Sequence, residues 1–176
     1  YFNKAQIVDK EGQARPLVAK EEKIVVTGKT PADFVSRGIT PMQSASLLLI
    51  LVAGISIYGI RRGKTLWGID LILFLVAGMA GCILAFLALF SQHPAVSPNY
   101  ILFVFHPFHL FCLPFMLSRV RKREISRYML VNFAVLTLFI GLWTIIPQRI
   151  PPAVLPLALC LLIRSASNLI LTYKRK

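Results

Sequence analysis

The fold of this chain is decided by residues 71–118, which read LILFLVAGMAGCILAFLALFSQHPAVSPNYILFVFHPFHLFCLPFMLS. These 48 residues, between Asp70 and Arg119, carry no formal charge. A single helix of that length would be about 70 Å long, more than twice the ~30 Å hydrocarbon core of a bilayer. The polar segment 91–99, SQHPAVSPN, lies near the middle of the run and contains two prolines. The stretch therefore predicts a membrane hairpin that turns at this segment.

The composition of the 176 residues also indicates a membrane protein. Hydrophobic residues make up 56% of the chain and charged residues 15%, whereas a soluble domain averages roughly 45–50% and about 25%. The net charge of +13 raises the question of nucleic-acid binding. Beyond residue 40, however, the 13 basic and 2 acidic residues lie mostly in clusters at 61–64, 119–127 and 174–176. Such clusters are typical of loops that meet anionic headgroups, so we expect a lipid bilayer and no nucleic acid as partner.

Five apolar segments account for most of the chain after residue 40. Each is close to the ~20 residues that a spanning helix needs. A bilayer offers the backbone no hydrogen-bond partners, and the alternation typical of a barrel strand is missing, so helices are expected. The prediction is an all-α membrane protein in which residues 41–176 form a bundle of five transmembrane helices. The expected helices are 42–60, 66–90, 100–117, 128–146 and 153–173.

Residues 1–40 differ from the rest in composition. Residues 5–8 and 13–18 are expected to form two short strands around a tight turn at 9–12, followed by a linker that enters the membrane near Pro41. Because an isolated hairpin is only marginally stable in water, this stub is interpreted as the end of an upstream domain missing from the sequence. A mobile tail is the alternative.

The loop charges predict the orientation. The loops after the first and third apolar segments are basic, the loop after the second is uncharged, and the loop after the fourth carries only Arg149. The positive-inside rule places the basic loops and the C-terminus in the cytoplasm. With five spans, residues 1–40 and the turn at 91–99 are expected outside.

Three polar residues within the apolar segments predict a buried network. Arg164 lies near the middle of the fifth segment and Asp70 about one turn into the second, while Asn168 is one turn from Arg164 on the same helix face. Ionisable groups within a bilayer are costly and generally paired or functional. We expect an ion pair between Asp70 and Arg164, completed by Asn168. Binding of a lipid phosphate by Arg164 is the alternative.

The outer half of the hairpin carries the residues considered for contact with a substrate or a neighbouring domain, which are His93, Asn99 and His109. His93 and Asn99 either cap the loop and start the third helix, or contact a lipid headgroup or a domain. His106 and His109 share a helix face only if Pro107 does not interrupt the helix. No membrane carboxylate is expected on this side, so neither a metal site nor a cofactor is predicted.

The three cysteines, Cys82, Cys112 and Cys160, lie in apolar segments without CxxC spacing. Such thiols generally act as small packing residues. No GxSxG motif is present either. The sequence therefore predicts no catalytic nucleophile.

Several strings in the hairpin resemble a known family. Residues 75–82 (LVAGMAGC), 90–94 (FSQHP), 97–100 (SPNY) and 107–110 (PFHL) resemble the membrane module of the Lnb-type lipoprotein N-acyltransferases of Bacteroidota, and residues 7–18 are similar to the last strands of their extracytoplasmic domain. The resemblance implies a periplasmic papain-like or NlpC/P60-like domain with catalytic Cys and His, followed by five helices. It also implies acylation of the amino-terminal cysteine of lipoproteins with a phospholipid acyl chain. That catalytic domain is not in this sequence, so no residue here inherits the nucleophile or the base.

The resemblance implies a role for the chain as a whole. We expect it to anchor the periplasmic catalytic domain in the bacterial inner membrane and to present phospholipid or lipoprotein acyl chains to that domain. Two alternatives stay open at this point. The chain could be a small transporter or channel subunit with Asp70, Arg164 and Asn168 along its path, or a purely structural membrane anchor.

Overall fold

The computed structural model describes residues 6–8, 12–16, 38–91 and 99–174. The chain divides into two compact units, residues 1–38 and 39–176. In the first unit, β1 (Gln6–Val8) pairs antiparallel with β2 (Ala14–Pro16), and Ile7 lies opposite Arg15. These strands fall within the two segments where the sequence predicts strands. The linker at 27–37 lies outside the described residues.

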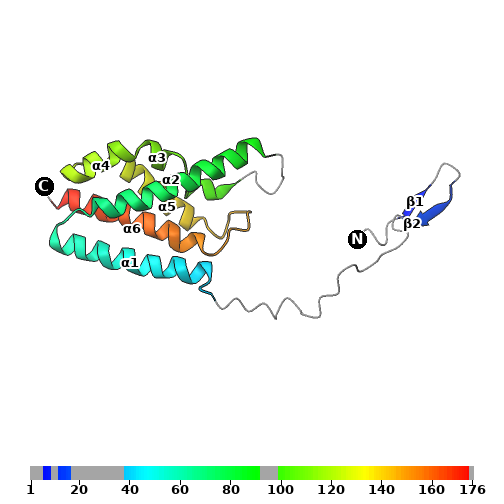
Figure 1. Ribbon diagram of the computed structural model, residues 1–176, viewed down its shortest axis with the longest axis horizontal. Helices are drawn as coiled ribbons and strands as arrows, with labels where there is room; N and C mark the ends of the chain where they lie inside the picture. Colours follow the sequence, from blue (N-terminus) through cyan, green and yellow to red (C-terminus); the bar gives the residue numbers. More distant parts are fainter. Residues whose placement is uncertain (1–5, 9–11, 17–37, 92–98, 175–176) are drawn as a thin grey trace. The chain divides into compact units, whose positions relative to one another are not determined.

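The second unit is helical (Figure 1). Among the described residues, three helices are long and apolar enough to cross a membrane, and a bent pair of helical segments is a fourth candidate. The three long helices measure about 33, 36 and 30 Å at 1.5 Å per residue, close to the ~30 Å hydrocarbon core. The elements are α1 (Pro41–Arg62), α2 (Trp67–Phe90), η3 (Tyr100–Phe103), α3 (Phe108–Phe111), α4 (Leu113–Lys122), α5 (Arg127–Gly141) and α6 (Val154–Tyr173).

The ends of α1 follow from local chemistry. Thr40 and Gln43 form a capping box, in which the Thr40 side chain accepts from the Gln43 N–H and the Gln43 side chain accepts from the Thr40 N–H. Pro41 occupies the first turn, where its missing N–H needs no partner. The helix ends at Gly63, whose φ of 60° is left-handed. These signals explain why α1 begins and ends within two residues of the predicted 42–60.

Helix α6 is the centre of the bundle. It packs against α1 on one side and α5 on the other, and it also contacts α2 (Figure 1). In an 18-residue apolar stretch of α6, 61% of the residues are buried, whereas the corresponding share is 22% in α1 and in α2. The two outer helices therefore present most of their apolar surface to lipid, whereas α6 presents most of its surface to protein.

The third apolar segment differs from the expected single helix at 100–117. The chain instead forms η3, α3 and α4, with a bend of 78° between Tyr100–Phe111 and Leu113–Lys122. The bend falls at Cys112 because Pro114 occupies the first turn of α4. A proline there cannot donate to the preceding turn, and its ring would clash with the carbonyl four residues earlier, so a new helix starts.

Two glycines of α2 allow this broken segment to lie directly on the helix. A Cβ atom on Gly78 would lie 2.6 Å from the backbone nitrogen of Leu110, and one on Gly81 would lie 2.5 Å from the carbonyl carbon of His106. Ordinary contacts of this kind are 3.4–4 Å. The missing side chains therefore bring the backbone of residues 106–110 against α2 and position both histidines.

Candidate functional site

The intramembrane polar residues come together where α1, α2 and α6 meet. The Arg164 guanidinium donates from Nε to Asp70 Oδ1 at 2.7 Å, from Nη2 to Asp70 Oδ2 at 3.1 Å, and from Nη1 to Ser56 Oγ at 2.9 Å. Asn168 Nδ2 also donates to Asp70 Oδ2, at 3.0 Å. Asp70 and Arg164 are both 0% exposed. The result is a bidentate, charge-assisted pair in which Asn168 is an additional donor to Asp70 Oδ2 and Ser56 is an additional acceptor for the guanidinium.

This arrangement favours packing over transport. A buried ion pair is tolerated when its geometry is good and the remaining hydrogen-bonding groups are satisfied, as for this carboxylate with its three donors. None of the hollows described below is lined by Asp70, Arg164 or Asn168. Arg164 therefore does not reach a lipid phosphate here, and the network fixes three helices against one another.

The second polar cluster surrounds His109, on α3. Its ring stacks on His106 with centroids 3.9 Å apart. His109 Nε2 lies 2.8 Å from the Val104 carbonyl oxygen, and Tyr128 Oη lies 2.6 Å from His109 Nδ1. Because a carbonyl only accepts, the network assigns the proton to Nε2, and Nδ1 accepts from the Tyr128 hydroxyl.

The sequence suggested that His109 contacts a substrate or a neighbouring domain, but the structure buries this residue. The side chain is 0% exposed, both ring nitrogens are occupied, and Phe74 packs edge-on against it at 5.2 Å. The ring is held inside the bundle because the break in the third segment turns it toward α2 and α5. A direct contact of His109 with a neighbouring domain is not available in this arrangement.

The other two residues considered for contact are Asn99 and His93. Asn99 Oδ1 accepts from the Ile101 N–H at 3.1 Å and caps η3. Gln148, from the loop after α5, accepts from the Tyr100 N–H at 2.7 Å and donates to Asn99 Oδ1 at 3.5 Å. Asn99 therefore ties the end of the hairpin to the α5–α6 loop. His93 lies outside the described residues.

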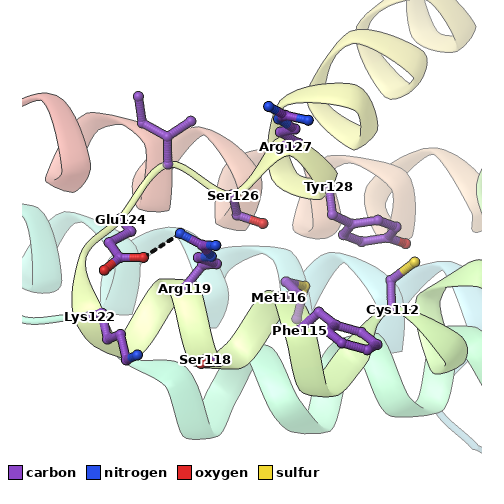
Figure 2. A pocket seen from close by; sticks show the side chains of 11 residues that line it. Cys112, Phe115, Met116, Ser118, Arg119, Lys122, Glu124, Ser126, Arg127 and Tyr128 are labelled. Atoms are coloured by element: carbon purple, nitrogen blue, oxygen red, sulfur yellow. Dashed lines mark hydrogen bonds and ion pairs between the residues drawn. The ribbon is translucent and has the colours of Figure 1, made fainter.

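Three hollows follow one side of α5. The first, here called the basic groove, lies between α4 and the start of α5 (Figure 2) and has a volume of about 1150 Å³. The middle hollow has about 610 Å³ and shares Cys112, Arg127 and Tyr128 with the basic groove. The outer hollow has about 290 Å³ and shares Phe103 and Val135 with the middle one. The hollows adjoin one another along the length of α5.

The outer and middle hollows have mostly apolar walls. The middle one is lined by Leu102, Phe103, His106, Phe108, Cys112, Arg127, Tyr128, Val131, Asn132 and Val135. The outer one is lined by Tyr100, Phe103, Val135, Leu138, Phe139, Leu142 and Ile146. Among the described residues no cluster of three or more His, Cys, Asp or Glu side chains could hold a metal ion. The site therefore offers shape and apolar surface, with few polar groups.

Residues 33–176 match the family described as the Lnb transmembrane domain. The chain belongs to the Lnb transmembrane domain family. The match and the helical structure confirm the predicted all-α membrane bundle of this type. The chain has no match among curated proteins or solved structures.

Within this Lnb transmembrane domain, the sequence indicated some polar contacts and missed others. The sequence singled out Asp70, Arg164 and Asn168 by their cost in lipid, and the three side chains contact one another in the structure. The sequence interpretation missed Tyr128, and it missed Asn132, whose Nδ2 donates to Ser165 Oγ at 2.8 Å. A single asparagine in an otherwise apolar segment was the available signal.

Two buried atoms of the Lnb transmembrane domain have no hydrogen-bond partner among the described residues near the middle hollow. They are His106 Nδ1 and Asn132 Oδ1. Both residues line that hollow, although the two atoms themselves are covered. Buried polar atoms are normally satisfied, so these two atoms are exceptions just behind a mostly apolar wall.

Proposed function

We propose that this Lnb transmembrane domain anchors the periplasmic catalytic domain of a lipoprotein N-acyltransferase in the bacterial inner membrane. In this proposal it also presents acyl chains of phospholipid or lipoprotein to that domain. The observation that carries the proposal is the pair of apolar hollows beside η3 and α5, in a chain that belongs to this family. Apolar concave surfaces with few polar groups are suited to acyl chains.

The distribution of basic residues supports the orientation in this proposal. The C-terminal ends of α1 and α6 and helix α4 lie at the same end of the bundle (Figure 1). Basic residues gather on these elements, at 61–64, 119–127 and 174–176. The positive-inside rule makes this end cytoplasmic. The start of α1 and the end of α2 then face the periplasm, on the side proposed for the catalytic domain.

The proposed mechanism is positional. Lipid tails are as apolar as the wall of the outer hollow, so the hydrophobic effect does not drive a chain from the bilayer into it. Shape and close packing would hold the chain instead. Holding a reactant in the correct geometry can contribute several kcal/mol, roughly 7–11 in the best cases, without any chemical group from the membrane domain. The nucleophile and the base would come from the periplasmic domain.

A pair of identical substitutions on α5 tests the presentation of acyl chains. Leu138 lines the outer hollow, whereas Leu130, on the same helix, lines none of the three hollows. Their exposed fractions are similar, 63% and 48%. In the full-length protein that carries the catalytic domain, Leu138→Trp should lower the acylation rate by roughly ten- to hundredfold, because small misplacements have effects of that size. Leu130→Trp should leave the rate near that of the unmodified protein.

The readout is mass spectrometry of the amino-terminal peptide of a reporter lipoprotein, at matched expression of both variants. Equal rates for the two variants would reduce the membrane domain to a simple anchor. The proposed anchoring role requires that the gene encode a domain with a Cys/His pair before residue 1. A reading frame without such a domain would contradict the anchoring role.

The turn at 91–99 is the proposed contact with the catalytic domain or a headgroup, through His93 and Asn99. Substituting both residues in the full-length protein should lower acylation at matched expression. Unchanged acylation would remove the turn from the proposal. Gln148→Leu is an informative companion, because it removes the contacts of Gln148 with Asn99 and with the Tyr100 N–H but changes no residue of 91–99.

A further inference from the structure

We propose that the basic groove binds an anionic glycerophospholipid, with the phosphate against Arg119 and Arg127 and an acyl chain directed toward the middle hollow. This inference concerns the end of the bundle opposite to the start of α1 and the end of α2, and it does not rest on the proposed acyltransferase role. It adds a lipid site in the leaflet that the charges predict to be cytoplasmic.

The walls of the basic groove come from α4 and from the start of α5, which are joined by the short loop 123–126. Helix α4 supplies Phe115 and Arg119, and the start of α5 supplies Arg127 and Tyr128. Figure 2 shows Arg119 extending from α4 toward the loop that leads into α5. The two arginines therefore lie on opposite walls of one hollow.

The charges of the groove are unbalanced toward positive. Three basic residues line it, Arg119, Lys122 and Arg127, against a single acidic residue, Glu124. Arg119 Nη1 lies 2.6 Å from Glu124 Oε2, but both side chains are well exposed, at 61% and 44%. Exposed ion pairs contribute little because water screens them. Arg119 can therefore turn toward a phosphate, or contact both groups, without a large loss.

Neighbouring arginines in the same basic cluster are already engaged elsewhere. The Arg121 guanidinium lies over the Trp67 ring at 3.8 Å, and Arg123 donates to the backbone carbonyl of Gly63. These contacts attach the C-terminal end of α4 to the start of α2 and to Gly63 in the loop before it. Arg121 and Arg123 therefore hold α4 in place, whereas Arg119 and Arg127 line the groove.

The continuity of the groove with the middle hollow points to a lipid. The basic groove and the middle hollow share Cys112, Arg127 and Tyr128. Beyond these residues the wall becomes apolar, with Phe108 and Val131. A site that is basic at one end and apolar at the other matches a phosphate attached to an acyl chain, and basic pockets between membrane helices bind anionic headgroups.

Lipid retention by the purified full chain tests this site. Native mass spectrometry should show stronger retention of phosphatidylglycerol than of phosphatidylcholine with the same acyl chains. Arg119→Gln combined with Arg127→Gln should lower the apparent affinity for phosphatidylglycerol by about fivefold for each arginine removed. The matched control is Arg61→Gln with Arg62→Gln, which removes two exposed charges at the same end of the bundle but outside the groove.

Three results would overturn the proposal. The first is equal retention of the two lipids by the unmodified chain. The second is an equal loss in the control pair, which would indicate general attraction to a basic surface. The third is competition by glycerophosphoglycerol, the headgroup without chains, as effective as competition by the whole lipid, which would indicate a site for a soluble anion. Circular dichroism of all variants should show unchanged helicity.

Discussion

Replacing Arg164 with methionine would leave the Asp70 carboxylate buried without its charged partner. In the structure this carboxylate accepts two hydrogen bonds from Arg164 and one from Asn168, and both members of the ion pair are 0% exposed. After the substitution only the Asn168 amide remains as a donor, and Ser56 loses the guanidinium as well. Methionine has a similar shape and keeps the apolar contacts of the long side chain.

The expected loss follows from this geometry. Removing one partner of a buried ion pair typically destabilises a protein by about 3–5 kcal/mol, because the other charge stays buried and unpaired. Asp70→Asn combined with Arg164→Met removes both charges, and such replacements are often neutral or even stabilising. The double variant should therefore be more stable than Arg164→Met alone, with a coupling of about 0.5–3 kcal/mol between the two sites.

The assay is unfolding of the purified full chain by a denaturing detergent, followed by far-ultraviolet circular dichroism. Arg149→Met is the matched control, because Arg149 is exposed in the loop after α5 and the chemical change is the same. It should shift the free energy of unfolding by no more than about 0.5 kcal/mol. The reasoning fails if Arg164→Met costs no more than Arg149→Met, or if the double variant is as unstable as the single one.

Two further predictions concern the packing of the broken third segment. Gly81→Ala places a methyl group against the backbone of residues 106–110 and should destabilise the protein by about 1–3 kcal/mol. The control is Gly54→Ala, where nothing lies within 4 Å of the added methyl group, and it should be neutral or slightly stabilising. Equal unfolding midpoints for the two variants would contradict the close approach at Gly81. Tyr128→Phe leaves His109 Nδ1 without its donor and should cost about 1–3 kcal/mol. The half-exposed Tyr58→Phe serves as control for the loss of a hydroxyl, and a Tyr128→Phe variant as stable as this control would exclude that hydrogen bond as a stabilising contact.

The bent third segment shows how far local signals extend. Pro107 was considered as an interruption, because proline removes a donor and clashes with the preceding turn, but one helix was still expected at 100–117 and Pro114 was overlooked. The two prolines are local signals of a break. They do not predict the 78° bend or its direction. Those depend on α2, where Gly78 and Gly81 leave room for the incoming backbone. The hollows beside α5 are a consequence of this packing, so the sequence contains no pattern for them.

The histidines show the same limit at the level of side chains. Their position on the hairpin was visible in the sequence, and His109 was therefore considered for contact with a substrate or a domain. Its burial depends on the rotation of α5, which turns Tyr128 toward the ring. Helical spacing fixes which residues share a face, but it does not fix which face of a neighbouring helix they meet.

By itself, the sequence determined the class of the protein, the apolar segments, the turn between the second and third of them, and the need of Arg164 for a partner. Each of these follows from the properties of the bilayer, which limits helix length and penalises an unpaired charge. Only the tertiary structure decided where the uncharged run breaks, which residues surround His109, and where the hollows lie. These features depend on how the helices approach and rotate against one another. Steric contacts between segments far apart in the chain control that approach.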